Sequence, residues 1–203
     1  MIRDAVDENE ARNRSEFIEH LVELAAHPSL ITVAPHCGAM ERHTDHQAEY
    51  VARVLGQDRA SAWMCKGWHR GGGAFAKWHI TSQDISERSF PLLNTILQRR
   101  FQHAVAFHCY CGGEVLIGGG ADLAVKTALQ NSITETLSGS RINVRVVAPG
   151  NQYAGCDPAN LVNRITADNN GIQIEQGRQA QVEYFSANAE AAAHVYRELT
   201  SLR

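Results

Sequence analysis

Two short apolar runs that each end in a histidine are the strongest constraint on the fold of this chain. The first run covers residues 30–35 and precedes His36, and the second covers residues 103–107 and precedes His108. Their content of β-branched and aromatic residues is typical of buried strands. In open α/β sheets, ligands bind beyond the carboxyl ends of parallel strands. The two runs therefore predict neighbouring parallel strands that bring both imidazoles to one point.

A carboxylate follows the first histidine after a short turn. Residues 36–41 read His-Cys-Gly-Ala-Met-Glu, and the small residues in the middle allow the backbone to turn until His36 and Glu41 face one point. Two imidazoles and one carboxylate are a typical ligand set of a catalytic zinc site, which keeps a fourth position open. The alternative is a strand end with a solvated histidine and a surface glutamate, since ten histidines in 203 residues make chance pairs common.

The rest of the chain alternates between strand-like and helix-like patterns. This alternation predicts an α/β fold, with a central mixed, mostly parallel sheet flanked by helices. We expect a polar amino-terminal segment over residues 1–14 and a single catalytic domain over residues 15–203. Further strands are predicted at 60–66, 75–81, 115–117, 142–148 and 171–175, and helices at 15–26, 44–55, 86–101, 122–137, 159–165 and 188–202.

Composition and charge exclude several classes of function. With 44% apolar and 20% charged residues the chain is globular, and its net charge of −3 leaves no electrostatic footprint for nucleic acid. No stretch approaches the 18 apolar residues of a membrane span. The five cysteines are an odd number, and the polar amino terminus lacks the apolar core of a signal peptide. We therefore expect reduced thiols and a cytoplasmic protein.

Further charged residues lie near the end of the last predicted strand. Glu175 ends the strand at residues 171–175 and is a candidate general base, which takes a proton from water and passes it to a leaving nitrogen. Arg164 and Arg178 flank it in sequence. Either guanidinium could stabilise an oxyanion or bind a substrate carboxylate.

Six short segments between residues 30 and 180 occur in the order of a known family. They are 36–41 (His-Cys-Gly-Ala-Met-Glu), 79–82 (His-Ile-Thr-Ser), 108–110 (His-Cys-Tyr), 117–119 (Ile-Gly-Gly), 163–164 (Asn-Arg) and 172–175 (Ile-Gln-Ile-Glu) with Arg178 soon after. Each segment alone is weak evidence of membership in a family. As an ordered set they resemble the poly-γ-glutamate hydrolases of bacteriophages and bacilli, which look like a compact version of the zinc carboxypeptidases.

The resemblance implies a zinc-carboxypeptidase-like fold and endo-cleavage of the γ-amide bonds of poly-γ-glutamate, a polyanionic polymer. A cytoplasmic enzyme would meet this extracellular polymer after cell lysis. The implied cofactor is one zinc ion per chain, and neither nucleic acid nor membrane is an expected partner. The implied roles are zinc binding by His36, Glu41 and His108 and general base catalysis by Glu175, with Arg178 and Arg164 beside it. His79, Tyr110 and Asn163 are candidates for substrate binding; the alternatives are a structural role for His79 and simple packing for Tyr110.

Departures from the family pattern leave the substrate open. Cys37 and Ala39 replace glycines after the first histidine, Cys109 replaces the glycine before the tyrosine, and His46 replaces a glutamate. If these positions contact substrate, the chain could instead be a zinc-dependent deacylase acting on a small N-acyl amino acid. A third alternative is a non-catalytic binding protein of the same fold, although a decayed site would not need to keep Glu175.

Overall fold

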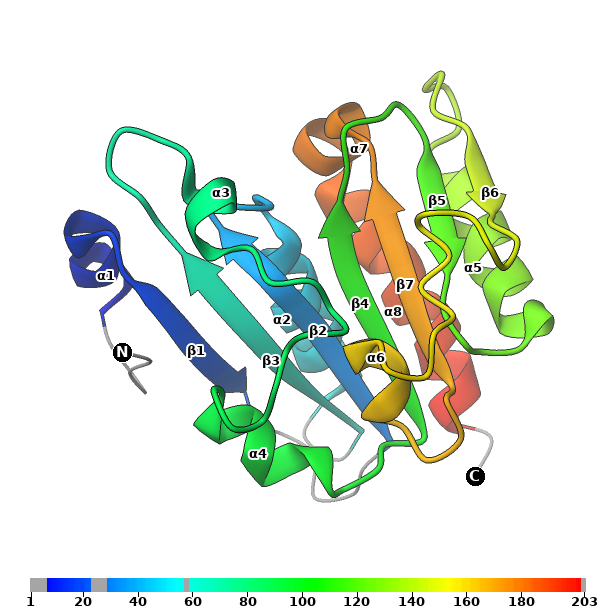
Figure 1. Cartoon of the computed structure of the whole chain (residues 1–203). Coiled ribbons are helices and arrows are strands. Elements are labelled where there is room, and N and C mark those ends of the chain that lie inside the picture. Colours follow the sequence, from blue (N-terminus) through cyan, green and yellow to red (C-terminus); the bar gives the residue numbers. More distant parts are fainter. Residues whose placement is uncertain (1–6, 23–28, 57–58, 202–203) are drawn as a thin grey trace.

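The computed structural model describes residues 7–22, 29–56 and 59–201. Within these ranges one mixed seven-stranded sheet has the order β1-β3-β2-β4-β7-β5-β6 (Figure 1). β1 is antiparallel to β3 and β5 is antiparallel to β7, whereas the other neighbours are parallel. The strands are β1 Phe17–Val22, β2 Leu30–Gly38, β3 Ala60–Gly67, β4 His103–Cys109, β5 Val115–Gly118, β6 Val144–Val146 and β7 Gly171–Gln176.

Helices cover both faces of the sheet. The larger core lies between the sheet and α2, α5 and α8, while α4 and α6 close the opposite face over a second core (Figure 1). The helices are α1 Glu8–Arg14, α2 Thr44–Leu55, α3 Ala74–Trp78, α4 Pro91–Leu97, α5 Leu123–Thr136, α6 Leu161–Arg164, α7 Arg178–Glu183 and α8 Phe185–Ser201. None of these helices is long and apolar enough to cross a membrane. The predicted α/β class is confirmed.

The two strands that end in histidine are parallel neighbours, as predicted. β2 pairs with β4 from Leu30 opposite His103 to Val33 opposite Ala106. From β2 the chain crosses through α2 to β3 on one side, whereas from β4 it continues to β5, β6 and β7 on the other side. β2 and β4 therefore form a topological switch point, where α/β sheets open a crevice for ligands.

The helix predicted over residues 15–26 is wrong within the described residues, because β1 occupies Phe17–Val22; residues 23–28 lie outside the described ranges. Apolar residues spaced for a helix are here divided between the two faces of an edge strand. The Glu19 carboxylate is buried and accepts hydrogen bonds from Trp63 and from the backbone of α4. These tertiary contacts outweigh local helix propensity.

Several other boundaries also differ from the sequence predictions. The strand predicted over 75–81 is helix α3 up to Trp78, followed by extended backbone at His79, and the helix predicted over 86–101 is restricted to α4. Helix α2 ends as predicted before Gly56, but its N-cap is His43 rather than Thr44. The five cysteines are free, as expected.

Candidate active site

A tight turn after β2 brings Glu41 back to His36. The Glu41 amide donates to the His36 carbonyl at 2.8 Å, and the Thr44 hydroxyl donates to the Glu41 carbonyl at 2.8 Å. Gly38 has a φ of +77°, and a Cβ there would lie 2.9 Å from the Gly67 amide nitrogen. Only glycine fits this conformation and this close approach without strain. The turn therefore places both side chains at one point, as the sequence predicted.

A β-bulge in β2 decides on which face of the sheet the His36 side chain lies. The register with β3 shifts between Ala34 and Cys37, which inserts one extra residue into β2. Leu30 and Ala34 pack in the core beneath α2, and Cys37 packs there as well, although regular alternation would turn it to the opposite face. The bulge thus turns His36 away from the helical core and into the site, a common use of bulges beside active sites.

His108 and Glu175 reach the same face by regular alternation. Phe107 in β4 and Ile174 in β7 point into the core beneath α8, so the residues that follow them point to the opposite side. His108 and Glu175 are also register partners in the parallel pair β4–β7. Their side chains therefore stand next to each other at the carboxyl ends of two adjacent strands.

Both histidines face the Glu41 carboxylate. His36 Nδ1 lies 3.2 Å from Glu41 Oε1, and His108 Nδ1 lies 3.5 Å from Glu41 Oε2, which also accepts from the Cys109 amide at 3.2 Å. His36 Nε2 lies 2.6 Å from the Ile80 carbonyl, which can only accept. The proton of a neutral His36 is therefore on Nε2, and its Nδ1 lone pair faces a carboxylate, an arrangement that a bound cation would stabilise.

The donor set fits a divalent metal ion. His36 Nδ1 lies 3.2 Å from one oxygen of Glu41 and His108 Nδ1 lies 3.5 Å from the other, separations near the roughly 3.3 Å between neighbouring ligands of a tetrahedral zinc ion, although His108 is not among the three residues whose ligand atoms all lie within 4.8 Å of one another. The backbone carbonyl at His36 Nε2 is the kind of partner that orients metal-binding imidazoles. His36, Glu41 and His108 could therefore hold such an ion.

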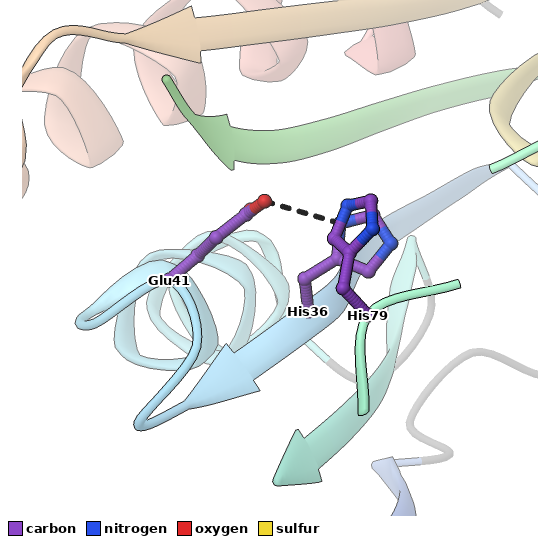
Figure 2. Close-up of side chains that lie close together, drawn as sticks. All are labelled: His36, Glu41 and His79. Carbon is purple, nitrogen blue, oxygen red and sulfur yellow. Dashed lines mark hydrogen bonds and ion pairs between the residues drawn. The ribbon is translucent and has the colours of Figure 1, made fainter. Parts of the chain in front are cut away.

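His79 adds a second possible ligand set. Its ring centroid lies 4.1 Å from that of His36, and the ligand atoms of His36, Glu41 and His79 lie within 4.8 Å of one another. Figure 2 shows the three side chains converging, with Glu41 opposite the two rings. The sequence predicted that His79 binds substrate. Its position next to His36 suits either a metal ligand or a residue that contacts substrate.

Burial and charge shift the proton affinities of the site in opposite directions. Burial favours protonated Glu41, but the attraction of His36 and His108 in their charged, donating forms outweighs it and lowers the pKa of Glu41 to about 2. Burial raises the pKa of Glu175 to about 7, against the attraction of His108. Burial also lowers the pKa of His79 to about 4. One carboxylate thus stays ionised while the other exchanges protons near neutral pH, as a general base must.

A cavity of about 1310 Å³ opens over these groups. The residues of the predicted site that line it are His36, Glu41, His79, His108, Tyr110, Glu175 and Arg178. Arg178 is exposed at the start of α7. The Tyr110 ring packs against Tyr153 at 4.7 Å between centroids, and its hydroxyl accepts from the Glu114 amide at 3.3 Å. This part of the predicted set is brought together.

Arg164 and Asn163 lie outside the cavity lining, contrary to the sequence prediction. The Arg164 guanidinium binds the Ile85 carbonyl and lies 3.3 Å from Glu87. The Asn163 amide joins two loops by donating to the Gly155 and Asp157 carbonyls at 2.8 Å and accepting from the Gly120 amide at 2.9 Å. Neither side chain lines the cavity, since Asn163 is engaged by these loop carbonyls and Arg164 is paired with Glu87.

Sequence reasoning missed Gln173 and Asn160, which line the cavity beside Glu175. Gln173 stands two residues before Glu175 in a strand, so it shares the same face. Alternation within the segment 172–175 was a signal that could have found it. Asn160 comes from the amino end of α6, and no local pattern links it to this strand.

A family model for poly-gamma-glutamate hydrolases matches residues 7–199. The chain belongs to this family. The solved structure of a bacteriophage poly-gamma-glutamate hydrolase has a TM-score of 0.70 and 24% identity, covering 96% of this chain and 97% of that one. The structure of YNDL in a zinc-free apo form has a TM-score of 0.67 and 18% identity and covers 98% of both chains.

A more distant structure has a related fold. N-formylglutamate amidohydrolase from Ralstonia eutropha JMP134 has a TM-score of 0.51 and 12% identity, covering 92% of this chain and 98% of that one. No curated protein matches the chain significantly. These likenesses establish the fold shared by this member of the poly-gamma-glutamate hydrolase family and related amidohydrolases.

Proposed function

We propose that this chain is a zinc-dependent hydrolase that cleaves the γ-glutamyl amide bonds of poly-γ-glutamate. The observation that carries the proposal is the convergence of His36, Glu41 and His108 beside Glu175 at the switch point of the sheet. Membership of the poly-gamma-glutamate hydrolase family supports the substrate, and a similar structure named as zinc-free supports the metal.

His36, Glu41 and His108 would hold one zinc ion. When bound, zinc supplies a Lewis acid that activates water and polarises the scissile carbonyl. The chain itself prepares the site for the ion: the Ile80 carbonyl fixes the His36 tautomer, and the Cys109 amide holds one Glu41 oxygen. The lowered pKa of Glu41 keeps its carboxylate ionised at any pH at which the enzyme would work.

Glu175 would act as the general base. Its pKa near 7, raised by burial, lets the carboxylate take a proton from the attacking water and return it to the leaving amide nitrogen. The neighbouring position of His108 in β4 places Glu175 beside the proposed metal ligands. Both roles need a carboxylate that exchanges its proton readily, which the Glu41 carboxylate does not.

The cavity also offers groups that suit a polyanionic substrate. Arg42 and Arg178 are the cationic side chains among the described lining residues. Each γ-linked glutamate carries a free α-carboxylate, which a guanidinium binds through two parallel hydrogen bonds. Tyr110 and His79 line the same cavity and are the remaining candidates for substrate contact.

The test combines zinc content with hydrolysis of poly-γ-glutamate by wild type and by Glu175→Gln. We expect about one zinc per chain in both proteins, shortening of the polymer by wild type, and loss of activity by a factor of about 10²–10⁴ in the variant. The absence of zinc from protein purified without chelator would refute the metal site.

A second candidate is a zinc-dependent deacylase acting on a small N-acyl amino acid. The exposed apolar side chains of Phe75 and Val182 in the cavity lining favour it, because a polyanion makes little use of them. Zinc-loaded wild type that leaves the polymer intact but releases the acyl group from N-acyl amino acids would establish this alternative. Binding of zinc without hydrolysis of either substrate class would instead favour a non-catalytic binding protein.

A further inference from the structure

A chain of three hydrogen bonds runs from the backbone of α6 to Glu175. The Val162 amide donates to Asn160 Oδ1 at 3.1 Å, Asn160 Nδ2 donates to Gln173 Oε1 at 2.9 Å, and Gln173 Nε2 donates to Glu175 Oε1 at 2.8 Å. The three side chains are buried, with relative exposures of 6% for Asn160, 6% for Gln173 and 7% for Glu175.

The direction of this chain is fixed at its first member. A backbone N–H can only donate, so Asn160 must turn its oxygen to Val162 and its nitrogen to Gln173. Gln173 must then accept with its oxygen, which leaves its nitrogen to face Glu175. Rotating either amide by 180° would place two donors or two acceptors against each other. Glu175 Oε1 therefore always meets an N–H group.

The loop before α6 leaves room for the Gln173 amide at Gly155. Gln173 and Glu175 project from the same face of β7 because they are two residues apart in a strand. A Cβ on Gly155 would lie 2.6 Å from Gln173 Oε1, and the positive φ of +57° at this residue also favours glycine. The loop before α6 thus approaches β7 closely enough to hold the amide in place.

Resting on the proposed function of Glu175, we propose that Gln173 and Asn160 are positioning residues that fix which carboxylate oxygen acts as the base. Gln173 Nε2 donates to Glu175 Oε1, and no described residue donates to Glu175 Oε2. The proton abstracted from water therefore goes to Oε2, from which it passes to the leaving nitrogen. Gln173 itself contacts neither proton nor metal in this scheme and acts only through Glu175.

Two variants break the chain at different members. Gln173→Met keeps the length of the side chain but removes the donor to Glu175. Asn160→Ser keeps an N-cap oxygen for Val162 but is too short to reach Gln173. Gln130→Met is the matched control, because Gln130 donates to the Val144 carbonyl at 3.0 Å from α5, outside the cavity lining.

The first measurement is steady-state hydrolysis of poly-γ-glutamate by the zinc-loaded proteins. We expect Gln173→Met to lower kcat about 10- to 100-fold, with KM changed less than about twofold and zinc content unchanged. Asn160→Ser should lower kcat in the same direction but less, and Gln130→Met should match wild type. Combining Gln173→Met with Glu175→Gln should cost nothing beyond Glu175→Gln alone, since the amide acts through that carboxylate.

The second measurement does not depend on the substrate. Carbon-13 NMR of glutamate-labelled protein follows the Glu175 carboxyl, whose signal is identified by its loss in Glu175→Gln. Gln173→Met removes a donor to the ionised carboxylate, so the midpoint of the Glu175 titration should move upward by about one pH unit. His108 and Glu41, the charged groups that face Glu175, are unchanged in this variant.

The two measurements separate the two proposals. A wild-type protein that leaves poly-γ-glutamate intact would refute the proposed function, while the NMR titration would still show whether Gln173 donates to the ionised Glu175 carboxylate. A Gln173→Met protein with the kcat and the Glu175 titration of wild type would overturn the positioning role and leave the proposed function standing.

Discussion

At the scale of single residues, the site separates two carboxylates by their surroundings. Glu41 lies between two imidazoles that hold it ionised, whereas Glu175 is buried with one neutral donor at Oε1, and its pKa rises to about 7. The same chemical group thus suits metal binding in one place and proton transfer in the other. This difference gives Glu175 a measurable effect on stability.

We expect Glu175→Gln to stabilise the metal-free protein, and more at pH 8 than at pH 5. Because the pKa of about 7 in the folded protein lies above the usual glutamate value of 4.5, protonated Glu175 favours folding below pH 4.5, and this contribution is lost as the pH rises through 7. The gain at pH 8 should be at most about 3 kcal/mol. Urea denaturation with chelator at both pH values measures it; an equal effect at both would contradict the raised pKa.

We expect Arg178→Ala to raise KM for poly-γ-glutamate about 10-fold, because a charge-assisted contact to a substrate carboxylate is lost. The difference from wild type should shrink as salt is added, since Arg178 is exposed. Steady-state kinetics at two ionic strengths measures both effects. Arg141→Ala is the control, as this exposed residue lies outside the cavity lining. An unchanged KM would remove Arg178 from substrate binding.

At the scale of elements, a buried carboxylate joins the edge strand to a helix. Glu19 in β1 accepts from Trp63 Nε1 in β3 at 2.7 Å and from the amides of Leu92 and Leu93 at the start of α4, at 2.9 and 2.6 Å. Three donors satisfy one anion, and the negative charge lies at the positive end of the helix. This contact holds α4 over β1 and explains why residues 17–22 form a strand.

We therefore expect Glu19→Gln to lower the free energy of unfolding by about 2–3 kcal/mol. The glutamine amide would turn a donor toward N–H groups that need an acceptor. Glu49→Gln is the matched control, because Glu49 pairs with Arg53 near the surface of α2, and its loss should cost less than about 0.5 kcal/mol. Urea denaturation of both variants decides; equal effects would show that the Glu19 contacts contribute little.

At the scale of the whole molecule, the site depends on elements far apart in the sequence. β2, β4 and β7 meet at their carboxyl ends, and behind them a buried amide pair joins Gln47 of α2 to Gln176 of β7. Asn188 of α8 donates to the same Gln176 oxygen at 2.9 Å. A ligand bound by residues from β2 and β4 therefore ties together the two halves of the sheet.

Removal of zinc should lower the melting temperature of the entire domain. A ligand that binds only the folded state adds about 2.7 kcal/mol at 100 times its dissociation constant. Differential scanning calorimetry with and without chelator measures this shift, and re-addition of zinc should reverse it. His36→Ala should show no response to chelator. A wild-type protein whose melting ignores the chelator would argue against a bound ion.

The local sequence determined the parts of the site that depend on short-range patterns. Apolar runs set β2 and β4, alternation set β7 and the face of His108 and Glu175, and small residues set the turn from His36 to Glu41. The family segments also follow from the sequence, because they are contiguous. These features need only strand periodicity and steric freedom, which a chain carries locally.

Tertiary structure decided the rest, because burial and pairing partners are not encoded in any one segment. The face of His36 depends on a bulge against β3, and the strand at residues 17–22 depends on donors in β3 and α4. Arg164 turns to Glu87 instead of the cavity, although it is part of a matching segment. The amides that hold Glu175 come from two elements brought together only by folding. The residue types of the site could therefore be predicted from the sequence, but the relative placement of their side chains could not.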